Sequence, residues 1–432
     1  MRSQHRFLVA LAAALLIAGS AFPQTQTVQT LTLQQAEQIA IQNYPQIQAA
    51  ADLAVAAQAQ VTQARAAYYP TATGSLTGVD AENNSRISAG ALNNPIIYDR
   101  YANGLAVTQL ITDFGRTHEL VKSSSEHARS QQENVLTTRA DVLLQLDQAY
   151  FGVLKAQAVL TVAEQTVKER QLVSDQITEL EKNKIKSGLD VSFANVDLSQ
   201  AQLLLIQTEN DLQASFAQLS AALGYSDQRT FQLTEEPLPS APPADVTVLI
   251  QQALKDRPEM IGQRLNVQSA QSYTTAERDL RLPTISAAGV AGLTPFAESP
   301  LGPRYAAAGF NVNIPLFNGH LYSALESEAA SRARAQDQYL RDLQNRITRD
   351  VRTAWLNANS AFQRLSVTEQ LLRESNQALD LAQSRYKLGL SSIIELSQAQ
   401  LNETQAQIEE ASAKYDFQGQ VSALNYQLGA LQ

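Results

Sequence analysis

Residues 107–119 read VTQLITDFGRTHE, and this stretch, with its counterpart PLFNGH at residues 315–320, decides the fold. The letters of Asp113-Phe114-Gly115 match the metal-binding loop of protein kinases, which also needs a glycine-rich loop, a strand lysine and an HRD-type loop upstream. None of these precedes Asp113, and the counterpart keeps a phenylalanine and a glycine without the aspartate. We therefore interpret both stretches as hinges between a strand and a helix. A phenylalanine anchors each junction and a glycine gives the backbone freedom, at Phe114, Gly115, Phe317 and Gly319.

The hinges belong to a larger internal repeat, in which two proline-ending segments recur at a constant offset. Asn43-Tyr44-Pro45 and Tyr68-Tyr69-Pro70 return as residues 256–258 and 281–283, so that 258 − 45 = 283 − 70 = 213. Such recurrence indicates two tandem structural repeats. We place them at residues 22–235 and 246–432, joined at 236–245 by an irregular, proline-rich linker.

Each repeat contains two segments without helical periodicity, which we expect to form strands. The clearest is residues 310–316, FNVNIPL, in which apolar residues alternate with asparagine and proline. Such alternation over about ten residues is typical of a transmembrane barrel strand, although a half-buried strand in a soluble hairpin alternates in the same way. The four expected strands cover about 71–80, 103–112, 284–293 and 306–316.

Long helical hairpins follow both hinges, at about 115–223 and 319–428, because these tracts contain no proline and very little glycine. Within the first hairpin, apolar residues repeat every seven positions, and a small or modest residue stands three positions after each. A sustained seven-residue stripe predicts a left-handed coiled coil. The repeating residues are Val191, Leu198, Leu205, Leu212 and Leu219, followed by Ala194, Ala201, Thr208, Ser215 and Ala222.

Four strands are too few for a barrel, because small closed barrels need about eight. Unpaired strand edges are also not tolerated in lipid. If the strands span a membrane, several copies of the chain must therefore share one barrel.

The N-terminus resembles a secretory signal, because Arg2, His5 and Arg6 precede the apolar residues 7–18 and the small residues 19–21. We expect residues 1–21 to be a signal peptide, so that the mature chain leaves the cytoplasm. Removing its two arginines leaves 31 basic against 42 acidic residues, a net charge of 31 − 42 = −11. This charge argues against nucleic acid as a partner.

The composition also argues against an enzyme. The chain has no cysteine and only four histidines, at positions 5, 118, 127 and 320. It therefore has no thiol nucleophile, and its histidines lack the spacing of a metal site. We expect no catalytic residue, no cofactor and no metal.

With these features together, the chain resembles the TolC-type outer-membrane efflux protein family, also called outer membrane factors. The resemblance covers nearly the whole mature sequence and rests on the paired proline segments, QLITDFGR at 109–116, PLFNGH, and the segments KSGLDVSFANVDLSQAQ and KLGLSSIIELSQAQ. It implies a mainly α protein with a membrane β-barrel. Three chains would share a twelve-stranded barrel, four strands from each, which continues as a long coiled-coil α-helical barrel into the periplasm.

The resemblance also implies a function and a location. The homotrimer would lie in the outer membrane of a Gram-negative-type bacterium, in contact with outer-membrane lipid. It would act as the passive exit duct of a tripartite efflux or type I secretion system. Its partners would be a periplasmic membrane-fusion adaptor and, through it, an inner-membrane pump of the RND or ABC type.

The family closes its tunnel with acidic side chains after the second helical turn, which implies a gate ring here. Counting six residues past Gly389 gives Glu395, and Gln398 replaces a second acid. The matching turn in the first half is three residues longer when counted from Gly188, so Asp190 and Asp197 are weaker candidates. In the alternative interpretation, Ser392 and Glu395 form only a capping box at a helix start.

The helical turns themselves are the implied docking surface for the adaptor, and a solvated turn is the alternative. The residues concerned are Lys186, Gly188, Leu189, Lys387, Gly389 and Leu390. For the protein as a whole, the alternative is a secreted or periplasmic coiled-coil structural protein whose strands form a soluble β cap.

Overall fold

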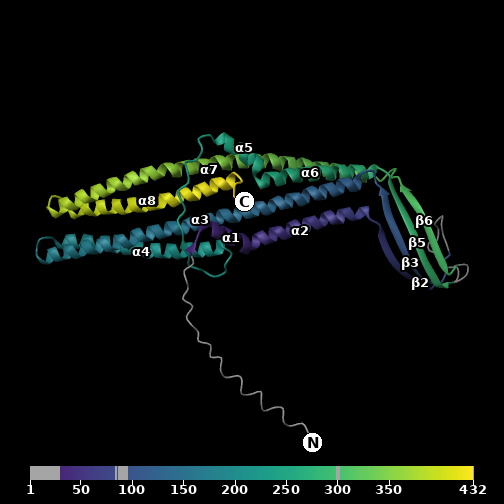
Figure 1. Ribbon diagram of the computed structural model, residues 1–432, viewed down its shortest axis with the longest axis horizontal. Coiled ribbons are helices and arrows are strands. Elements are labelled where there is room, and N and C mark those ends of the chain that lie inside the picture. Colours follow the sequence, from purple (N-terminus) through teal and green to yellow (C-terminus); the bar gives the residue numbers. More distant parts are fainter. Residues whose placement is uncertain (1–29, 83–84, 86–95, 298–301, 432) are drawn as a thin grey trace, which may run out of the picture.

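A helical rod with a small β-sheet at one end makes up the chain (Figure 1). The computed structural model describes residues 30–82, 85, 96–297 and 302–431, so the expected signal peptide at 1–21 lies outside the described residues. The chain is mainly helical. Within the described part, no helix combines the length and the apolar character that crossing a membrane requires.

The same order of elements occurs twice along the chain, with equal helix lengths. Corresponding helices have 11, 21, 67 and 35 residues in both halves. The first half comprises β1 (Thr30–Leu31), α1 (Leu33–Asn43), α2 (Pro45–Arg65), η1 (Ala66–Tyr68), β2 (Thr71–Val79), β3 (Arg100–Thr112), α3 (Arg116–Lys182) and α4 (Gly188–Ala222). The second comprises β4 (Gln232–Leu233), α5 (Val246–Asp256), α6 (Pro258–Arg278), η2 (Asp279–Arg281), β5 (Thr284–Ala297), β6 (Arg304–Asn313), α7 (Leu321–Lys387) and α8 (Ile393–Gln427).

Proline determines where the helices near the sheet begin. Pro45 and Pro258 occupy the first positions of α2 and α6, where a helix does not need the missing N–H group. The preceding residues, Tyr44 and Arg257, are extended, as expected before proline. The chain therefore breaks between α1 and α2, and again between α5 and α6.

The four long strands form one antiparallel sheet in the order β2-β3-β5-β6. Strands β3 and β5 lie in the centre and join the two halves of the chain. The expected strand over 306–316 was wrong at its end, since β6 stops at Asn313. Pro315 has no backbone N–H to donate to a neighbouring strand. Within one chain the sheet is open, with β2 and β6 at its edges.

Both hinges place glycine in a backbone conformation that other residues rarely adopt. Gly115 has a φ of 118° and Gly319 a φ of 62°. The Asp113 carboxylate caps α3 by accepting hydrogen bonds from the backbone N–H (2.8 Å) and the hydroxyl (2.5 Å) of Thr117. Phe114 and Phe317 are exposed within one chain, and their role as anchors therefore remains a proposal.

The helices form a curved layer in which α3 is central. Near the sheet, α3 lies between α2 and α6, and α7 packs on the other side of α6. Farther from the sheet, α3 lies between α4 and α8, and α7 packs against α8. The two lateral edges of this layer are α2 with α4 on one side and α7 on the other.

Small residues make the closest contacts of the first hairpin. Ala194, Ala201 and Thr208 on α4 are buried, whereas Leu198 and Leu205 are only half-buried. The seven-residue stripe therefore packs with its small positions innermost, where they allow α3 and α4 to approach closely. The larger side chains flank this contact.

A buried tyrosine connects the main core to the short sheet at the middle of the rod. Tyr150 is fully buried beside Leu146 and Leu219. Its hydroxyl lies 2.9 Å from the carbonyl oxygen of Leu31 and 2.6 Å from that of Thr234. These contacts hold the parallel strands β1 and β4 against α3.

We predict that Tyr150→Phe destabilises the protein by about 1 kcal/mol, because it removes the hydrogen bonding of a buried hydroxyl to the carbonyl oxygens of Leu31 and Thr234. The midpoint of urea-induced unfolding should fall. Tyr225→Phe is the matched control, since it removes a hydroxyl at the edge of the same core and should change the midpoint much less. An equal effect of the two substitutions would contradict this role of Tyr150.

Candidate functional site

The turns that join the long helices lie at the end of the rod opposite the sheet (Figure 1). In the second turn, Gly389 is left-handed (φ 75°), and the N–H of Leu390 donates to the carbonyl of Arg385 (2.8 Å). In the first turn the left-handed residue is Lys184 (φ 58°), and the N–H of Ile185 donates to the carbonyl of Leu180 (2.9 Å). Gly188 instead begins α4.

This geometry corrects the expected correspondence between the turns. Lys184, not Gly188, is the counterpart of Gly389, and the offset is 389 − 184 = 205. The helix caps follow the same offset, since Ser187 caps α4 and Ser392 caps α8. The expectation of a first turn three residues longer was therefore wrong. It aligned two glycines, whereas a lysine takes the left-handed position of the first turn.

Asp190 and Glu395 are equivalent residues in this alignment, but their carboxylates bind differently. Ser187 and Asp190 form a complete capping box, with reciprocal hydrogen bonds of 3.3 and 3.0 Å. At the second turn only the serine half is present, because the Ser392 hydroxyl accepts from the N–H of Glu395 (3.4 Å). The Glu395 carboxylate instead lies 3.0 Å from Nε of Arg385. The capping box of the alternative interpretation is therefore incomplete, because the Glu395 carboxylate does not cap α8.

A tyrosine links the two turns to each other. The Tyr386 hydroxyl donates to the Asp190 carboxylate (3.2 Å), and Nζ of Lys186 lies 3.6 Å from the centre of the Tyr386 ring. Burial and the nearby carboxylate raise the pKa of Tyr386 to about 12, so its hydroxyl remains a donor at neutral pH. A second link between the hairpins lies seven residues farther along α4, where the Ser397 hydroxyl donates to the Asp197 carboxylate (2.6 Å). Gln398 contacts its own helix, donating to Asn402 (2.9 Å).

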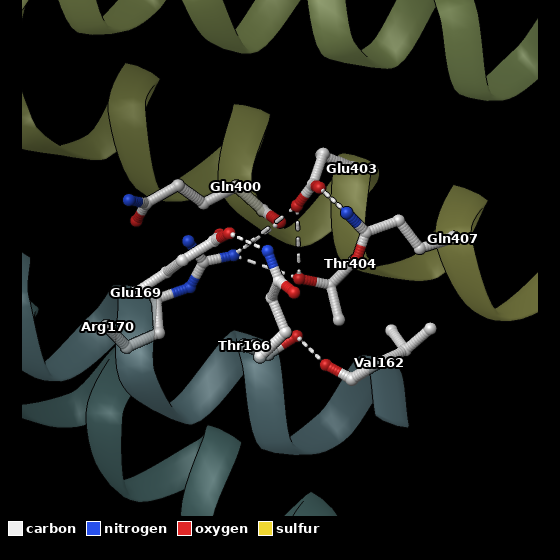
Figure 2. A network of polar contacts seen from close by, with 9 residues as sticks. Val162, Thr166, Glu169, Arg170, Gln400, Glu403, Thr404 and Gln407 are labelled. Atoms are coloured by element: carbon white, nitrogen blue, oxygen red, sulfur yellow. Dashed lines mark hydrogen bonds and ion pairs between the residues drawn. The ribbon is translucent and has the colours of Figure 1, made fainter. Parts of the chain in front are cut away.

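Farther from the turns, a buried arginine joins the two hairpins (Figure 2). Arg170 on α3 is 5% exposed, and its Nη2 donates to the Gln400 carbonyl (2.8 Å) and to the Thr404 hydroxyl (2.9 Å). The Glu403 carboxylate lies 3.9 Å from the same nitrogen, and Gln407 contacts its other oxygen. Burial raises the pKa of Glu403, and the positive charge of Arg170 opposes this rise. The sequence analysis did not identify this network, because no local pattern marks the burial of Arg170.

A groove with a mixed polar and apolar lining lies beside the turns, between residues of α3, α7 and α8. Its volume is about 510 Å³. Lys186 and Lys387, both expected docking residues, line it together with apolar side chains that include Leu172, Ile177 and Leu379. The remaining docking candidates, Leu189 and Leu390, are exposed at the turns.

Comparison with known protein families identifies the chain. The model of the family described as "Outer membrane efflux protein" matches residues 36–225 and 249–430, most of the chain. The chain belongs to the outer membrane efflux protein family. This confirms the resemblance seen in the sequence and the outer-membrane location, and it places the chain in a family of channels rather than enzymes.

Curated relatives and solved structures agree with this assignment. The chain is 23% identical over 328 residues to outer membrane protein TolC of Escherichia coli, covering 72% of this chain and 66% of TolC. It is 24% identical over 355 residues to outer membrane protein OprJ of Pseudomonas aeruginosa, covering 80% of this chain and 73% of OprJ. A structure of the outer-membrane channel OprN matches with a TM-score of 0.79 at 17% identity, covering 92% of this chain and 90% of that one, which shows the fold.

Within this family member, a further buried carboxylate lies at the middle of the rod. Asp147 on α3 is 2% exposed, and its Oδ1 atom has no hydrogen-bond partner within the described residues. Burial raises the pKa of Asp147 to about 7; a hydrogen bond with Ser422 of α8 opposes this, and the Glu37 carboxylate of α1 adds to it. The sequence analysis did not single out Asp147, because a single acid in a polar helix does not reveal its burial.

Asp147 should make stability depend on pH. A carboxyl group with a raised pKa in the folded state binds its proton more tightly there, so stability is lost as pH rises from about 4 to about 7. Asp147→Asn should remove this loss and raise the unfolding temperature at pH 8 but not at pH 4. Thermal unfolding across this pH range measures the effect, with the exposed Asp211→Asn as control. An unchanged pH profile in Asp147→Asn would contradict the assignment.

Proposed function

We propose that the protein is the outer-membrane exit duct of an efflux system, in which three copies form one continuous channel. The observation that carries this proposal is that the β-sheet and the helical layer of a single chain both have edges without a partner. The sheet ends at β2 and β6, and the helical layer ends at α2 with α4 and at α7. The equal helix lengths of the two halves support two tandem repeats, at 22–235 and 246–432.

The sheet edges are suited to each other. Because the sheet alternates in direction from β2 to β6, the β6 strand of one copy is antiparallel to the β2 strand of the next. Three copies of four strands give twelve, enough for a closed barrel. Closure is required in lipid, where unpaired backbone groups cost several kcal/mol each.

Both helical edges carry exposed apolar residues at multiples of seven positions. On α4 these are Leu189, Val196 and Leu203. On α7 they are Val367 and Leu381, with the charged Glu374 midway between them, and Leu388 follows at the C-cap. Equal heptad spacing allows knobs-into-holes packing. We assign this contact to α4 of one copy and α7 of the next.

The linker between the two proposed repeats, residues 236–245, is bound by side chains of the second hairpin. Gln418 of α8 donates to the carbonyl of Glu236 (2.8 Å), and Trp355 of α7 donates from Nε1 to the carbonyl of Pro243 (2.7 Å). The linker is therefore fixed to the second hairpin on its way from α4 to α5.

The turns form the closed entrance and the docking surface in this proposal. Asp190 and Glu395 of three copies would ring the tunnel, while Gln398 and Asp197 extend this region. A periplasmic adaptor would dock on the exposed Leu189 and Leu390 and in the groove beside Lys186 and Lys387. An inner-membrane pump of the RND or ABC type would supply the energy. One relative of this chain is named a toluene efflux pump outer membrane protein; type I secretion would use the same architecture.

The shared wall can be tested with a charge at the helical edge. Leu203→Glu should abolish the trimer and its channels, because it places a carboxylate in an apolar contact between copies. Gln202→Glu, on the adjacent face of the same helix, should leave both intact. Cross-linking of detergent-solubilised protein and conductance in planar bilayers measure the two effects. A wild-type protein that folds as a monomer without affinity for lipid would refute the proposed duct.

Opening the entrance should require the link between the turns to break. Tyr386→Phe removes the hydrogen bond to Asp190 and keeps the aromatic ring beside Lys186. We predict a higher single-channel conductance or a larger open fraction than in the wild type. Tyr339→Phe, at an exposed position of the same helix, is the control. Equal conductance in all three proteins would exclude this link as part of the gate.

A further inference from the structure

We propose that Arg385 determines the ion selectivity of the entrance by neutralising the Glu395 ring. This inference rests on the proposed function, since it concerns the current through a trimeric channel. Arg385 then makes the entrance only weakly selective for cations over anions and insensitive to block by polyvalent cations. This holds although each copy contributes one Glu395 carboxylate to the ring.

The inference depends on the contact between Arg385 and Glu395, which forms within one chain and does not involve a neighbouring copy. Nε of Arg385 lies 3.0 Å from Oε1 of Glu395, and Nη2 of Arg385 donates to the carbonyl of Leu390 (3.3 Å). The guanidinium therefore stays beside the carboxylate whichever way Glu395 faces. Three unpaired carboxylates around a narrow pore would attract cations strongly. Three carboxylates that are each paired with a guanidinium create only a weak electric field in the pore.

The other repeat shows why Arg385 is needed. Asp190 is the equivalent of Glu395, but it is held by Ser187 and Tyr386 with Lys186 close by. At the offset of 205 residues, the position equivalent to Arg385 is Leu180. The charge of Asp190 is thus balanced by Lys186 of the same turn. The charge of Glu395 is balanced by Arg385, at a position where the first repeat has a leucine.

The charge of each turn agrees with this interpretation. Residues 179–190 contain three acids and three lysines, and the equivalent residues 384–395 contain one acid, one arginine and one lysine. The first turn therefore sums to zero and the second to +1, in a chain of net charge −9. Gln398 adds no charge. Neither turn has a net negative charge, and Arg385 contributes to this balance in the second.

The pair has little structural role, which makes it suitable for substitution. The side chains of Arg385 and Glu395 are 54% and 46% exposed, and ion pairs at such exposure add little to stability. Variants at these positions should therefore fold and assemble, which circular dichroism and cross-linking of the purified trimer would verify.

The experiment records purified trimers in planar bilayers for the wild type, Arg385→Gln, Arg385→Lys and the double variant Arg385→Gln/Glu395→Gln. A KCl gradient gives the reversal potential, and added La³⁺ or Mg²⁺ gives the concentration that halves the current. We expect Arg385→Gln to shift the reversal potential toward cation selectivity and to lower the half-blocking La³⁺ concentration at least about tenfold. Arg385→Lys and the double variant should behave like the wild type.

Two results would overturn the inference. One is an Arg385→Gln channel with the selectivity and block of the wild type. The other is a double variant that keeps the altered selectivity, since the effect would then not come from Glu395. Absence of channels in every protein, including the wild type, would instead refute the proposed duct itself.

Discussion

Unpaired edges are the constraint on which the rest of this structure depends. Among the described residues, β2 pairs along one side with β3 and β6 along one side with β5, so each has a free row of backbone donors and acceptors. In lipid such rows must be paired. The helical layer has the same form, since the apolar residues of α4 and α7 at its edges remain exposed within one chain. A single chain thus cannot complete either layer.

The contacts inside one chain divide into two kinds. The hairpins are held by apolar and small residues, as in the contact of α3 with Ala194 and Ala201 of α4. The seam between the hairpins carries polar contacts, from Tyr426 with Asp141 (2.5 Å) to Lys155 with Asp416 (2.8 Å) and Arg170 with Gln400. Buried polar pairs add less to stability than apolar packing of the same size. Near the turns an apolar cluster also joins the hairpins, with Ile177 of α3 beside Leu379 of α7 and Leu396 of α8, so separation there would expose apolar side chains.

The two repeats have the same backbone but different chemistry at their turns. Equal helix lengths and the offset of 205 residues preserve the geometry, so Asp190 and Glu395 occupy the same helical position. Their neighbours differ, since Tyr386 binds the first carboxylate and Arg385 the second. The two repeats thus share the same helical geometry, and differences at single positions determine which side chain binds the carboxylate of each turn.

The sequence by itself determined the elements and their repetition, because these depend on local rules. Proline at helix starts, glycine at the hinges and the seven-residue period each act on neighbouring residues, and Pro45, Gly115 and Ala201 lie where these rules place them. Only the tertiary structure decided which distant side chains meet. The pairing of Arg385 with Glu395, the burial of Arg170 and Asp147, and the left-handed Lys184 have no local signature. Each depends on segments brought together by the packing of two hairpins, and a linear pattern does not encode that proximity.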